Sequence, residues 1–494
     1  MTEKVVIKCI PTGVPGLDAV LGGGIPEFSF NLIAGPPGCG KTTLANQMMF
    51  SMATVERPAL YLMVLGEPPL KMLRYQQQFD FFNADLIDSA VRFVNLTDDT
   101  MGSDLEGVLR RITAEVEKHK PAFVFVDSFR SLLLAAHSEA ESRNRLQRFV
   151  QQLGILMTSW QATTFLIGEY SSDSEANPVF TIADGLIWLR QSVQRNSMVR
   201  KIEVVKMRGQ ATIAGLHSFR IGMGGVEVFA IVASPSAERV EQNRHEQPRL
   251  KIGVGAIDEM MGGGIPRGYS LLVAGPSGAG KSIMAAAFLA EGARCGETGV
   301  LAAFEQNPNR SLNRVVADLI ANKTVGLVDT NALDVSIDEV LVRIVREIQR
   351  LKATRVVIDS LSGFELAIAP TFREDFRESL SQLVFALVAT GVTVFMTSEL
   401  EDRFTDLRFS PYGTAFLTDA IIVQRYVEVE SRLRRVLAVV KVRGSAHSDE
   451  LREYHIDDFG IQIGAIIGDQ EGLLAGSPTQ ARTSEGVPLA AVAQ

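Results

Sequence analysis

The sequence predicts an α/β protein made of two tandem domains, each with a mostly parallel sheet flanked by helices. One observation is the motif G-x-x-x-x-G-K-[ST], which occurs once in each half and which commonly lies between a strand and a helix. A second is that short apolar runs alternate with amphipathic stretches in both halves, as expected for buried parallel strands joined by helices. A third is the length of 494 residues, which suits two domains of this class.

Each copy of the motif has the composition of a phosphate-binding loop. Glycines let the backbone curl so that successive N–H groups converge on a β-phosphate, the lysine reaches the β and γ oxygens, and the hydroxyl helps to hold Mg²⁺. A chance match is the alternative, but both copies follow an apolar run and their lysines are 240 residues apart. We therefore predict two nucleotide sites. Their binding residues are Gly35, Gly38, Gly40, Lys41, Thr42 and Thr43 in the first half, and Gly275, Gly278, Gly280, Lys281 and Ser282 in the second.

The repeat extends beyond the loops. Residues 12–26 match residues 252–266, and both blocks contain the sequence Gly-Gly-Gly-Ile-Pro. A period this long indicates duplicated domains rather than a solenoid. A polar, charged segment around residues 234–248 is predicted to link them. The predicted domains are residues 1–238 and 249–467, followed by a flexible tail at 468–494.

The central strands are predicted from apolar runs that contain few polar residues, which suits strands buried on both faces. In chain order they lie at residues 30–34, 59–65, 122–126 and 163–167 in the first half, and at 270–274, 299–304, 355–358 and 392–396 in the second. The sequences Ser103-Asp-Leu-Glu106 and Ser336-Ile-Asp-Glu339 are capping boxes. They predict that a helix begins before the third of these strands in each half.

The composition is that of a globular protein, with 46% hydrophobic and 21% charged residues. The net charge of −8 disfavours general binding to nucleic acid, although a local basic channel is compatible with it. Three scattered cysteines form neither a disulfide framework nor a zinc site, which favours a reducing cytoplasm. We find no signal peptide and no apolar run of about 18 residues, so we expect no membrane partner.

An aspartate ends one apolar run in each half and is followed by a serine. These residues are Asp127 and Asp359. In P-loop NTPases an aspartate at this place organises Mg²⁺ together with the loop hydroxyl. A turn or capping aspartate is the alternative, which the duplication disfavours. The predicted metal-site residues are therefore Thr42 and Asp127 in the first half, and Ser282 and Asp359 in the second.

Glutamates that follow the second strand of each half are candidate general bases, because a carboxylate there would polarise the attacking water. Glu67 lies 26 residues after its loop lysine, and Glu305 lies 24 residues after its own. A solvated glutamate at a strand end is an equally good interpretation. Glu169 and Glu399 end a later strand, and they are candidates either for positioning water or nucleotide or for a structural salt bridge.

Two basic pairs recur in front of a glycine, Lys206 with Arg208 in the first half and Lys441 with Arg443 in the second. Each pair ends a run of alternating apolar residues, so both side chains are expected on one face of a strand. A solvated strand edge is the alternative. The repetition favours a phosphate-sensing pair, which ring-shaped ATPases supply across a subunit interface in the manner of an arginine finger.

With these motifs assembled, nearly the whole chain resembles the KaiC and KaiC-like family of tandem RecA-like P-loop ATPases. The Gly-Gly-Gly-Ile-Pro blocks, both phosphate loops, both Asp-Ser strand ends and both Lys-x-Arg-Gly signatures agree with the family. The resemblance implies an ATP-dependent double-ring homo-hexamer, with ATP and Mg²⁺ at subunit interfaces and Lys-x-Arg reaching a neighbour's γ-phosphate. It also implies ATP hydrolysis and a clock-type or signalling switch that works through regulatory partner proteins.

The chain departs from the family pattern at the candidate base. The family has a Glu-Glu pair where this chain has Gly66-Glu67 in the first half and Glu305-Gln306 in the second. Each half therefore keeps one member of the pair. The departure favours Glu305 as the better candidate general base.

A second departure concerns phosphoryl transfer to the protein. The family's second domain is a serine/threonine autokinase, but its adjacent acceptor pair is replaced here by Ala415-Phe416. Thr414 and Thr418 are the nearby hydroxyls that could substitute.

Two functions of other classes also remain open. One is a RecA-like nucleic-acid-dependent ATPase, because the core is shared with those enzymes. The other is an ATP-assembled scaffold with little turnover.

Overall fold

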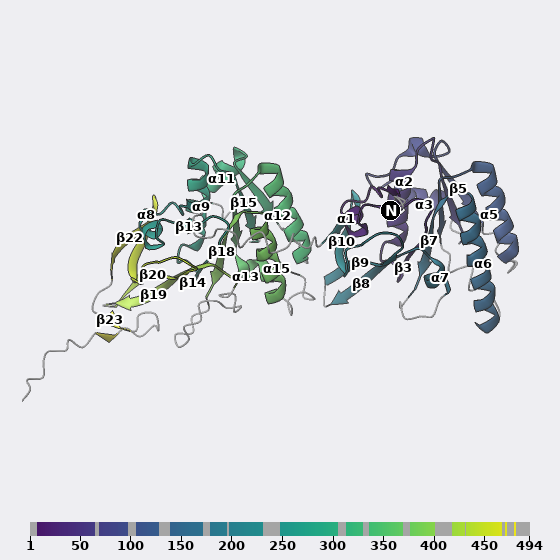
Figure 1. Cartoon of the computed structure of the whole chain (residues 1–494). Helices are drawn as coiled ribbons and strands as arrows, with labels where there is room; N and C mark the ends of the chain where they lie inside the picture. The colour runs from purple at the N-terminus through teal and green to yellow at the C-terminus, as the bar shows by residue number, and fades with distance from the viewer. Residues whose placement is uncertain are drawn as a thin grey trace, which may run out of the picture. The chain divides into compact units, whose positions relative to one another are not determined.

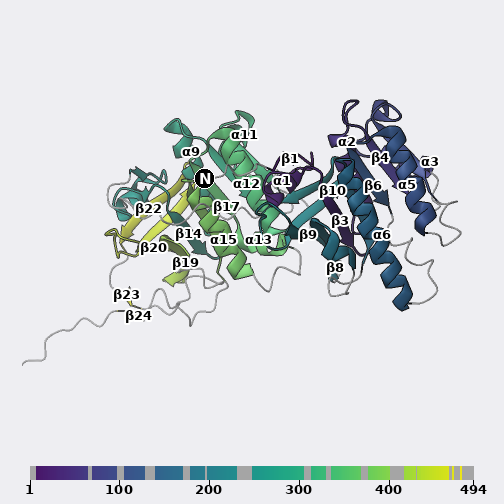
Figure 2. The ribbon, with the colours of Figure 1, turned by 45° about the vertical axis from the view of Figure 1, so that its right-hand side comes forward.

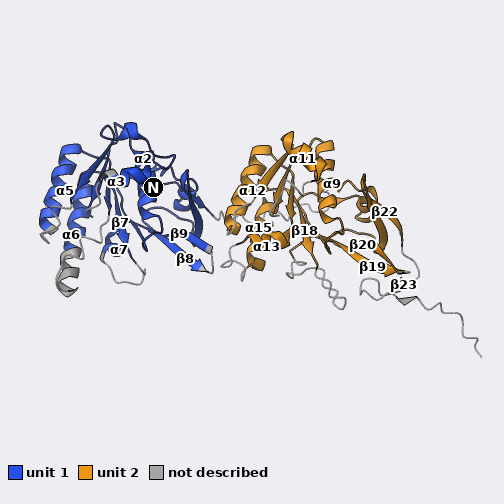
Figure 3. Cartoon of the chain, turned by 180° about the vertical axis from the view of Figure 1, so that it is seen from behind, with its two compact units in different colours: residues 1–232 blue, residues 233–494 orange. Residues whose placement is uncertain are grey.

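The computed structural model describes residues 7–64, 69–96, 105–127, 139–170, 178–194, 197–230, 248–304, 313–329, 335–368, 376–400, 417–429, 431–466, 470–471 and 479–480. The chain forms two compact units, residues 1–232 and 233–494, which Figure 3 shows in different colours. Several residues singled out above lie outside the described residues, namely Gly66, Glu67, Ser103, Glu305, Gln306, Thr414, Ala415 and Phe416.

Unit 1 is built on one nine-stranded sheet with the strand order β11-β10-β9-β8-β3-β7-β6-β4-β5 (Figure 1). Its strands are β3 (Phe30–Gly35), β4 (Ala59–Met63), β5 (Val91–Asn95), β6 (Phe123–Asp127), β7 (Thr163–Glu169), β8 (Gly185–Gln194), β9 (Ser197–Met207), β10 (His217–Gly222) and β11 (Gly225–Phe229). Its helices are α1 (Leu17–Leu21), α2 (Lys41–Met52), α3 (Pro69–Gln76), α5 (Leu105–His119), α6 (Glu139–Ser159) and α7 (Pro178–Ile182), with a 3-10 turn η1 (Ala84–Leu86). A small ribbon of β1 (Cys9–Ile10) and β2 (Ile25–Pro26) precedes the sheet.

Unit 2 repeats this plan with the strand order β16-β15-β17-β18-β14-β19-β20-β21-β22. Its strands are β14 (Ser270–Gly275), β15 (Gly299–Ala303), β16 (Val325–Asp329), β17 (Arg355–Asp359), β18 (Thr393–Glu399), β19 (Ala420–Val429), β20 (Arg432–Val442), β21 (Arg452–Asp457) and β22 (Gly460–Ile466). Its helices are α8 (Gly255–Met260), α9 (Lys281–Arg294), α11 (Arg314–Ala321), α12 (Ile337–Leu351), α13 (Leu361–Ala367) and α15 (Phe376–Ala389). Two further ribbons are β12 (Arg249–Leu250) with β13 (Ile265–Pro266), and β23 (Gln470–Glu471) with β24 (Thr479–Gln480).

Read from its antiparallel end, the order of unit 2 is β22-β21-β20-β19-β14-β18-β17-β15-β16, which matches the order of unit 1 strand for strand and confirms the internal repeat. In unit 1, strands β8, β3, β7, β6, β4 and β5 are parallel, whereas β9, β10 and β11 continue the sheet as an antiparallel meander. Each predicted central strand is present, and its ends lie within three residues of the prediction, the largest difference being at the end of β18. The prediction of two tandem α/β domains with mostly parallel sheets is confirmed.

Helices cover both faces of each sheet (Figures 1 and 2). In unit 1, α1 and α2 pack on one face, and α5, α6 and α7 pack on the other. In unit 2, α8, α9 and α11 share one core, and α12, α13 and α15 share the other. Alternate side chains of one strand enter opposite cores, so Ile33 of β3 faces α2 while Leu32 faces the other layer. This explains why the central strands are continuously apolar.

The Gly-Gly-Gly-Ile-Pro blocks are structural. In unit 1 the Asp18 carboxylate accepts hydrogen bonds from the backbone N–H of Thr12, at 2.9 Å, and from its hydroxyl, at 2.7 Å. In unit 2 the Asp258 carboxylate accepts from the N–H of Ile252 at 2.6 Å. Each aspartate therefore ties the short first helix to the ribbon before it. The predicted capping box at Ser336 is also confirmed, because its hydroxyl accepts from the N–H of Glu339 at 3.1 Å. The one at Ser103 lies outside the described residues.

Candidate nucleotide sites

Both predicted phosphate loops connect the central strand of a sheet to a helix. In unit 1 the loop follows β3 and opens α2 at Lys41, and in unit 2 it follows β14 and opens α9 at Lys281. The residue before each lysine is a glycine with positive φ, 105° at Gly40 and 96° at Gly280. A side chain is strained in that conformation, so glycine is required at this turn. The first N–H groups of α2 and α9 are unpaired within their helices and face the loop, as anion binding requires.

The two glycines also allow a close approach from the antiparallel end of each sheet. A Cβ atom on Gly40 would lie 2.6 Å from the Cδ1 atom of Ile221 on β10. One on Gly280 would lie 2.7 Å from the Cδ1 atom of Ile456 on β21. Each loop is therefore supported by a β-hairpin from the meander of its own unit, β10–β11 or β21–β22.

The two loop lysines are buried and fold over their own loops. The Nζ atom of Lys41 donates to the carbonyl oxygen of Pro36 at 2.8 Å. The Nζ atom of Lys281 donates to the carbonyl oxygens of Gly275 at 2.9 Å and Pro276 at 2.8 Å. Burial lowers the pKa of Lys281, while the carboxylates of Glu399 and Asp359 act in the opposite direction. Both ammonium groups thus lie inside the loop that a phosphate would enter.

The predicted metal residues of unit 1 meet. The hydroxyl of Thr42 donates to Oδ2 of Asp127 at 2.9 Å, and the hydroxyl of Tyr61 donates to the same oxygen at 2.7 Å. Burial raises the pKa of Asp127, and the two hydroxyl donors and Lys41 partly offset that rise. Tyr61 was not singled out in the sequence, because it lies inside an apolar strand and belongs to no motif.

The metal residues of unit 2 have other partners. Asp359 ends β17 beside the loop, and its Oδ1 atom accepts a hydrogen bond from the hydroxyl of Thr397 on β18. Ser282 lies in the first turn of α9 with an exposed side chain. Ser360 caps α13 through a hydrogen bond from the N–H of Gly363 at 3.1 Å, and the peptide bond between Asp359 and Ser360 is cis. Thr397, like Tyr61, was missed by motif reasoning.

The donor sets of both units fit Mg²⁺. Among the described residues there is no group of three or more His, Cys, Asp or Glu side chains that could cage a metal. Mg²⁺ rarely needs such a cage, since it commonly binds through one or two carboxylates, substrate phosphates and water. A loop hydroxyl with one aspartate, Thr42 with Asp127 or Ser282 with Asp359, is a set of this kind.

Glu169 and Glu399 lie next to the phosphate loops. In the strand register Glu169 is the partner of Gly35, and Glu399 is the partner of Gly275. Both side chains are exposed at the strand end. The structure therefore places these two carboxylates at the C-terminal ends of the central strands, where the loops begin.

The Lys-x-Arg pairs lie at the opposite ends of the strands, beside the N-terminal ends of β8 and β3 in unit 1 and of β19 and β14 in unit 2. Lys206 pairs in register with Leu186 near the start of β8, and β8 starts beside the first residues of β3. Its Nζ atom donates to the carbonyl oxygens of Thr181 at 3.2 Å and Ala183 at 2.6 Å. The phosphate loop follows the C-terminal end of β3, whereas Lys206 lies beside its N-terminal end. Lys206 is therefore at the far end of the strand from the loop of its own unit.

Arg208 and the second pair share this arrangement. Arg208 forms an ion pair with Asp184 at 3.1 Å, and Arg443 forms one with Asp419 at 3.4 Å. Lys441 donates to the carbonyl oxygen of Thr418 at 2.6 Å. Both arginine side chains remain more than half exposed, at 59% and 56%. In each pair the lysine lies within a strand, β9 or β20, and the arginine directly follows the last residue of that strand. That both side chains share one face of a strand stays a prediction. Thr418 itself is buried, with 1% of its surface exposed.

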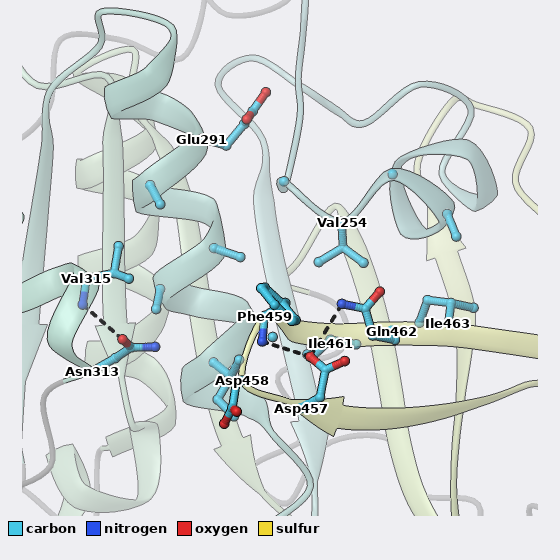
Figure 4. Close-up of a pocket in the computed structure, with 18 of the residues that line it drawn as sticks. Val254, Glu291, Asn313, Val315, Asp457, Asp458, Phe459, Ile461, Gln462 and Ile463 are labelled. Carbon is cyan, nitrogen blue, oxygen red and sulfur yellow. Dashed lines mark hydrogen bonds between the residues drawn. The ribbon is translucent and has the colours of Figure 1, made fainter.

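A cavity of about 620 Å³ borders the loop helix of unit 2 (Figure 4). It lies between one face of α9, the start of α11 and the hairpin β21–β22. Its walls include Val254, Ile283, Ala287, Ala290 and Ile461, and acidic and amide groups at Asp457, Asp458 and Asn313 stand at its rim. A concave site that combines apolar walls with a few polar groups can hold a small molecule.

Unit 1 is different at the same place. Phe50 occupies the repeat position of Ala290, and its ring lies 5.1 Å from the ring of Phe82 and 6.4 Å from that of Phe81. The backbone N–H of Asp80 donates to the carbonyl oxygen of Met223 at the tip of the hairpin, at 2.9 Å. In unit 1 an aromatic cluster therefore stands beside the loop helix at the place where unit 2 has Ala290.

The fold and the two loops together define a tandem P-loop ATPase of the RecA-like class. A family model for the KaiC ATPase matches residues 10–233 and again residues 250–467. The chain therefore belongs to the KaiC family of ATPases, as the sequence motifs indicated.

Several curated proteins resemble the chain over nearly its whole length. It is 26% identical to the circadian clock oscillator protein KaiC of Thermostichus vulcanus over 502 residues, covering 99% of this chain and 95% of that protein. It is 27% identical to the circadian clock oscillator protein KaiC 1 of Synechocystis sp. over 493 residues, covering 97% and 93%. Within the described residues, the helices are too short or too polar to cross a membrane.

Proposed function

We propose that both units bind ATP with Mg²⁺ and that the chain hydrolyses ATP. The observation that carries this proposal is the Lys41, Thr42 and Asp127 arrangement, repeated by Lys281, Ser282 and Asp359 at the same edge of the second sheet. In this proposal the lysine and the N–H groups of the loop hold the phosphates, while the aspartate and loop hydroxyl orient Mg²⁺. Bound Mg²⁺ would supply neutralisation of the phosphate charge.

We further propose that the nucleotide base lies against the hairpin that supports each loop. The support is the cavity in unit 2, since its wall residue Ile461 belongs to the hairpin that packs on Gly280. In unit 1 the rings near Phe81 would form the corresponding wall. The two sites would therefore hold the base against different surfaces.

The assembly that we propose is a ring of identical chains, with six copies as in the family expectation. Its support is the direction of the Lys-x-Arg pairs. Arg208 and Arg443 lie at the ends of the strands opposite to their own phosphate loops and are largely exposed. A cation in this position serves a nucleotide bound by a neighbouring copy. It would act as an arginine finger, which stabilises the charge that develops on the transferred phosphoryl group.

Mixing two inactive variants tests this arrangement. Both carry Lys41→Ala to silence the first site, and one adds Lys281→Ala while the other adds Arg443→Ala. Neither releases phosphate alone, but their mixture does, because some interfaces combine an intact Lys281 with an intact Arg443. Arg350→Ala is the control, since Arg350 is an exposed arginine paired with Glu347 on its own helix. Activity of the Arg443→Ala variant by itself, or a mixture without activity, would contradict the proposal.

The biological role that we propose is a signalling or timing switch that works through partner proteins. Protein phosphorylation is not part of this proposal, because the acceptor pair is Ala415-Phe416 and Thr418 is buried. Incubation with γ-labelled ATP separates the two activities, since label in free phosphate reports hydrolysis and label on the protein reports kinase action. Label on Thr418 would overturn this part.

A further inference from the structure

The two magnesium-organising aspartates are each held by a buried hydroxyl group, but the hydroxyl comes from opposite neighbouring strands. In unit 1, β6 lies between β4 and β7, and the hydroxyl is that of Tyr61 on β4. In unit 2, β17 lies between β15 and β18, and the hydroxyl is that of Thr397 on β18. The strand orders are otherwise the same, so the donor has moved from one side of the aspartate to the other.

The repeat positions of the two donors are apolar. Leu301 on β15 stands where Tyr61 stands on β4, because both are the third residue of their strands. Ile167 on β7 stands where Thr397 stands on β18, because both are the fifth residue of theirs. Leu301 and Ile167 are buried, at 6% and 1% exposure. Each unit therefore has one hydroxyl and one aliphatic side chain flanking its aspartate, in reversed places.

The strand register explains why either side can supply the donor. Asp127 pairs in register with Met63 on β4 and with Ile167 on β7. Ile167 is therefore beside the aspartate, at the place from which Thr397 reaches Asp359. A short threonine side chain suffices from that position. Tyr61 is two residues before Met63, and its long side chain carries the hydroxyl forward to the carboxylate.

The side chain of Tyr61 is completely buried. Its ring packs against Phe93 at 5.4 Å and against Phe125 at 6.0 Å. Burial and the neighbouring Asp127 carboxylate raise the pKa of Tyr61, so the hydroxyl stays protonated and donates. A buried carboxylate needs such donors, because an ionised group without hydrogen bonds is costly in the interior.

The donor matters most when the loop hydroxyl is engaged elsewhere. Thr42 and Tyr61 both donate to Oδ2 of Asp127. If Thr42 turns towards a metal, Tyr61 is the donor that still holds the carboxylate in place. In unit 2 the hydroxyl of Thr397 donates to Asp359 from the neighbouring strand.

We propose that Tyr61 and Thr397 are positioning residues that orient Asp127 and Asp359 for Mg²⁺, and that the two donors are interchangeable between the flanking strands. The proposal rests on the proposed function, in which these aspartates organise Mg²⁺. It predicts that a threonine at position 167 can replace the hydroxyl of Tyr61. Motif comparison alone would not find this relation, because neither donor lies in a motif.

The test measures the Mg²⁺ concentration at which binding of a fluorescent ATP analogue is half complete. The first site is isolated with Lys281→Ala. In that background Tyr61→Phe, which keeps the ring, raises the Mg²⁺ midpoint about tenfold, the size expected for losing one hydrogen bond to a charged group. Adding Ile167→Thr to Tyr61→Phe returns the midpoint towards its original value. Ile167→Thr alone leaves it unchanged, because Tyr61 still donates.

The second site is tested in the Lys41→Ala background. Thr397→Val removes the donor with little change of shape and raises the Mg²⁺ midpoint, whereas Thr397→Ser keeps it. Affinity measured with a chelator present is expected to stay the same in all variants, which separates orientation of the metal site from damage to the nucleotide pocket. Thermal melts by circular dichroism identify any variant that is merely unstable.

The outcomes distinguish this inference from the proposed function. If the parent chain binds the analogue with no dependence on Mg²⁺, the proposed function itself fails. If the parent depends on Mg²⁺ while Tyr61→Phe and Thr397→Val keep its midpoint, only the positioning role is overturned. A Mg²⁺ midpoint that Tyr61→Phe raises and that adding Ile167→Thr does not lower would also overturn it, since the two donors would then not be equivalent.

Discussion

Arg355 at the start of β17 is the most completely enclosed cation among the described residues of unit 2, with 2% of its side chain exposed. Its Nε atom donates to Glu297 at 2.6 Å, and its NH1 atom donates to the carbonyl oxygens of Lys251 and Phe288, both at 2.8 Å. The guanidinium also lies 4.5 Å from the centre of the Phe288 ring. Replacing it with leucine removes all of these bonds and leaves Glu297 and two carbonyl groups without their donor.

The expected loss of folding stability is large because the contacts that Arg355→Leu removes are buried. Removing one partner of a buried ion pair costs about 3–5 kcal/mol. A domain of this size loses about 2–4 °C in melting temperature per kcal/mol, so Arg355→Leu should lower the melting temperature of unit 2 by about 6–20 °C. Unit 1 supplies the control. Arg57 pairs with Glu27 at 2.9 Å and lies over the Phe123 ring, but it is 36% exposed, so Arg57→Leu should cost about 0–1 kcal/mol.

Two probes assign the change to its unit. The two tryptophans, Trp160 and Trp188, both lie in unit 1, so their fluorescence reports that unit alone, while far-ultraviolet circular dichroism reports both. Arg355→Leu should shift only the transition that tryptophan fluorescence does not detect. The double variant Arg355→Leu/Glu297→Leu should recover part of the loss, because no unpaired carboxylate remains. Equal losses for Arg355→Leu and Arg57→Leu would refute the reasoning, since burial would then not set the cost.

Four further changes test other parts of the structure. Gln424→Leu should stabilise unit 2 by about 1–3 kcal/mol in the same melts. The side chain of Gln424 is fully buried, and neither its amide oxygen nor its amide nitrogen has a hydrogen-bond partner in the described part of the chain. The repeat position in unit 1 is Leu189, so leucine fits this place in the fold. Acidification should weaken Mg²⁺-dependent ATP binding at the first site at a higher pH than for an exposed aspartate, because burial raises the pKa of Asp127 and its protonated form cannot organise the metal. Tyr61→Phe should move that loss to still higher pH, since the tyrosine hydroxyl lowers this pKa; Mg²⁺ midpoints measured across a pH series in the Lys281→Ala chain check both signs. Ala287→Trp should fill the cavity beside α9 and weaken ATP-analogue binding at the second site about tenfold or more in the Lys41→Ala chain, and unchanged binding would place the base elsewhere.

Much of the fold was predictable because its signals are local. The central strands are recognisable as apolar runs, and their ends were correct within three residues because the runs are bounded by polar or glycine residues. The loop glycines were predictable since the turn itself demands them, as the positive φ of Gly40 and Gly280 shows. The antiparallel strands were harder to place. The hairpins β10–β11 and β21–β22 carry ordinary alternating patterns, and nothing in those patterns says that Ile221 and Ile456 pack on the phosphate loops.

The candidate site divides in the same way. The lysines, loop hydroxyls and aspartates follow from motifs, and the structure brings Thr42 and Asp127 together at 2.9 Å. The catalytic roles predicted for Glu67 and Glu305 stay predictions, because both residues lie outside the described residues. The direction of Lys206 and Lys441 could not be predicted, since it depends on which end of the neighbouring strand each one meets.

The sequence by itself determined that this chain is a duplicated nucleotide-binding protein, because phosphate loops, strand-ending aspartates and capping boxes are short patterns that repeat in register. Only the tertiary structure decided how the two copies differ. Strand order and register bring Tyr61 to one aspartate and Thr397 to the other, and they place the Lys-x-Arg pairs far from their own loops. They also leave a cavity beside α9 in unit 2, whereas Phe50 of unit 1 packs against Phe81 and Phe82. These are contacts between residues far apart in the chain, and their pairing is set by packing rather than by any local pattern.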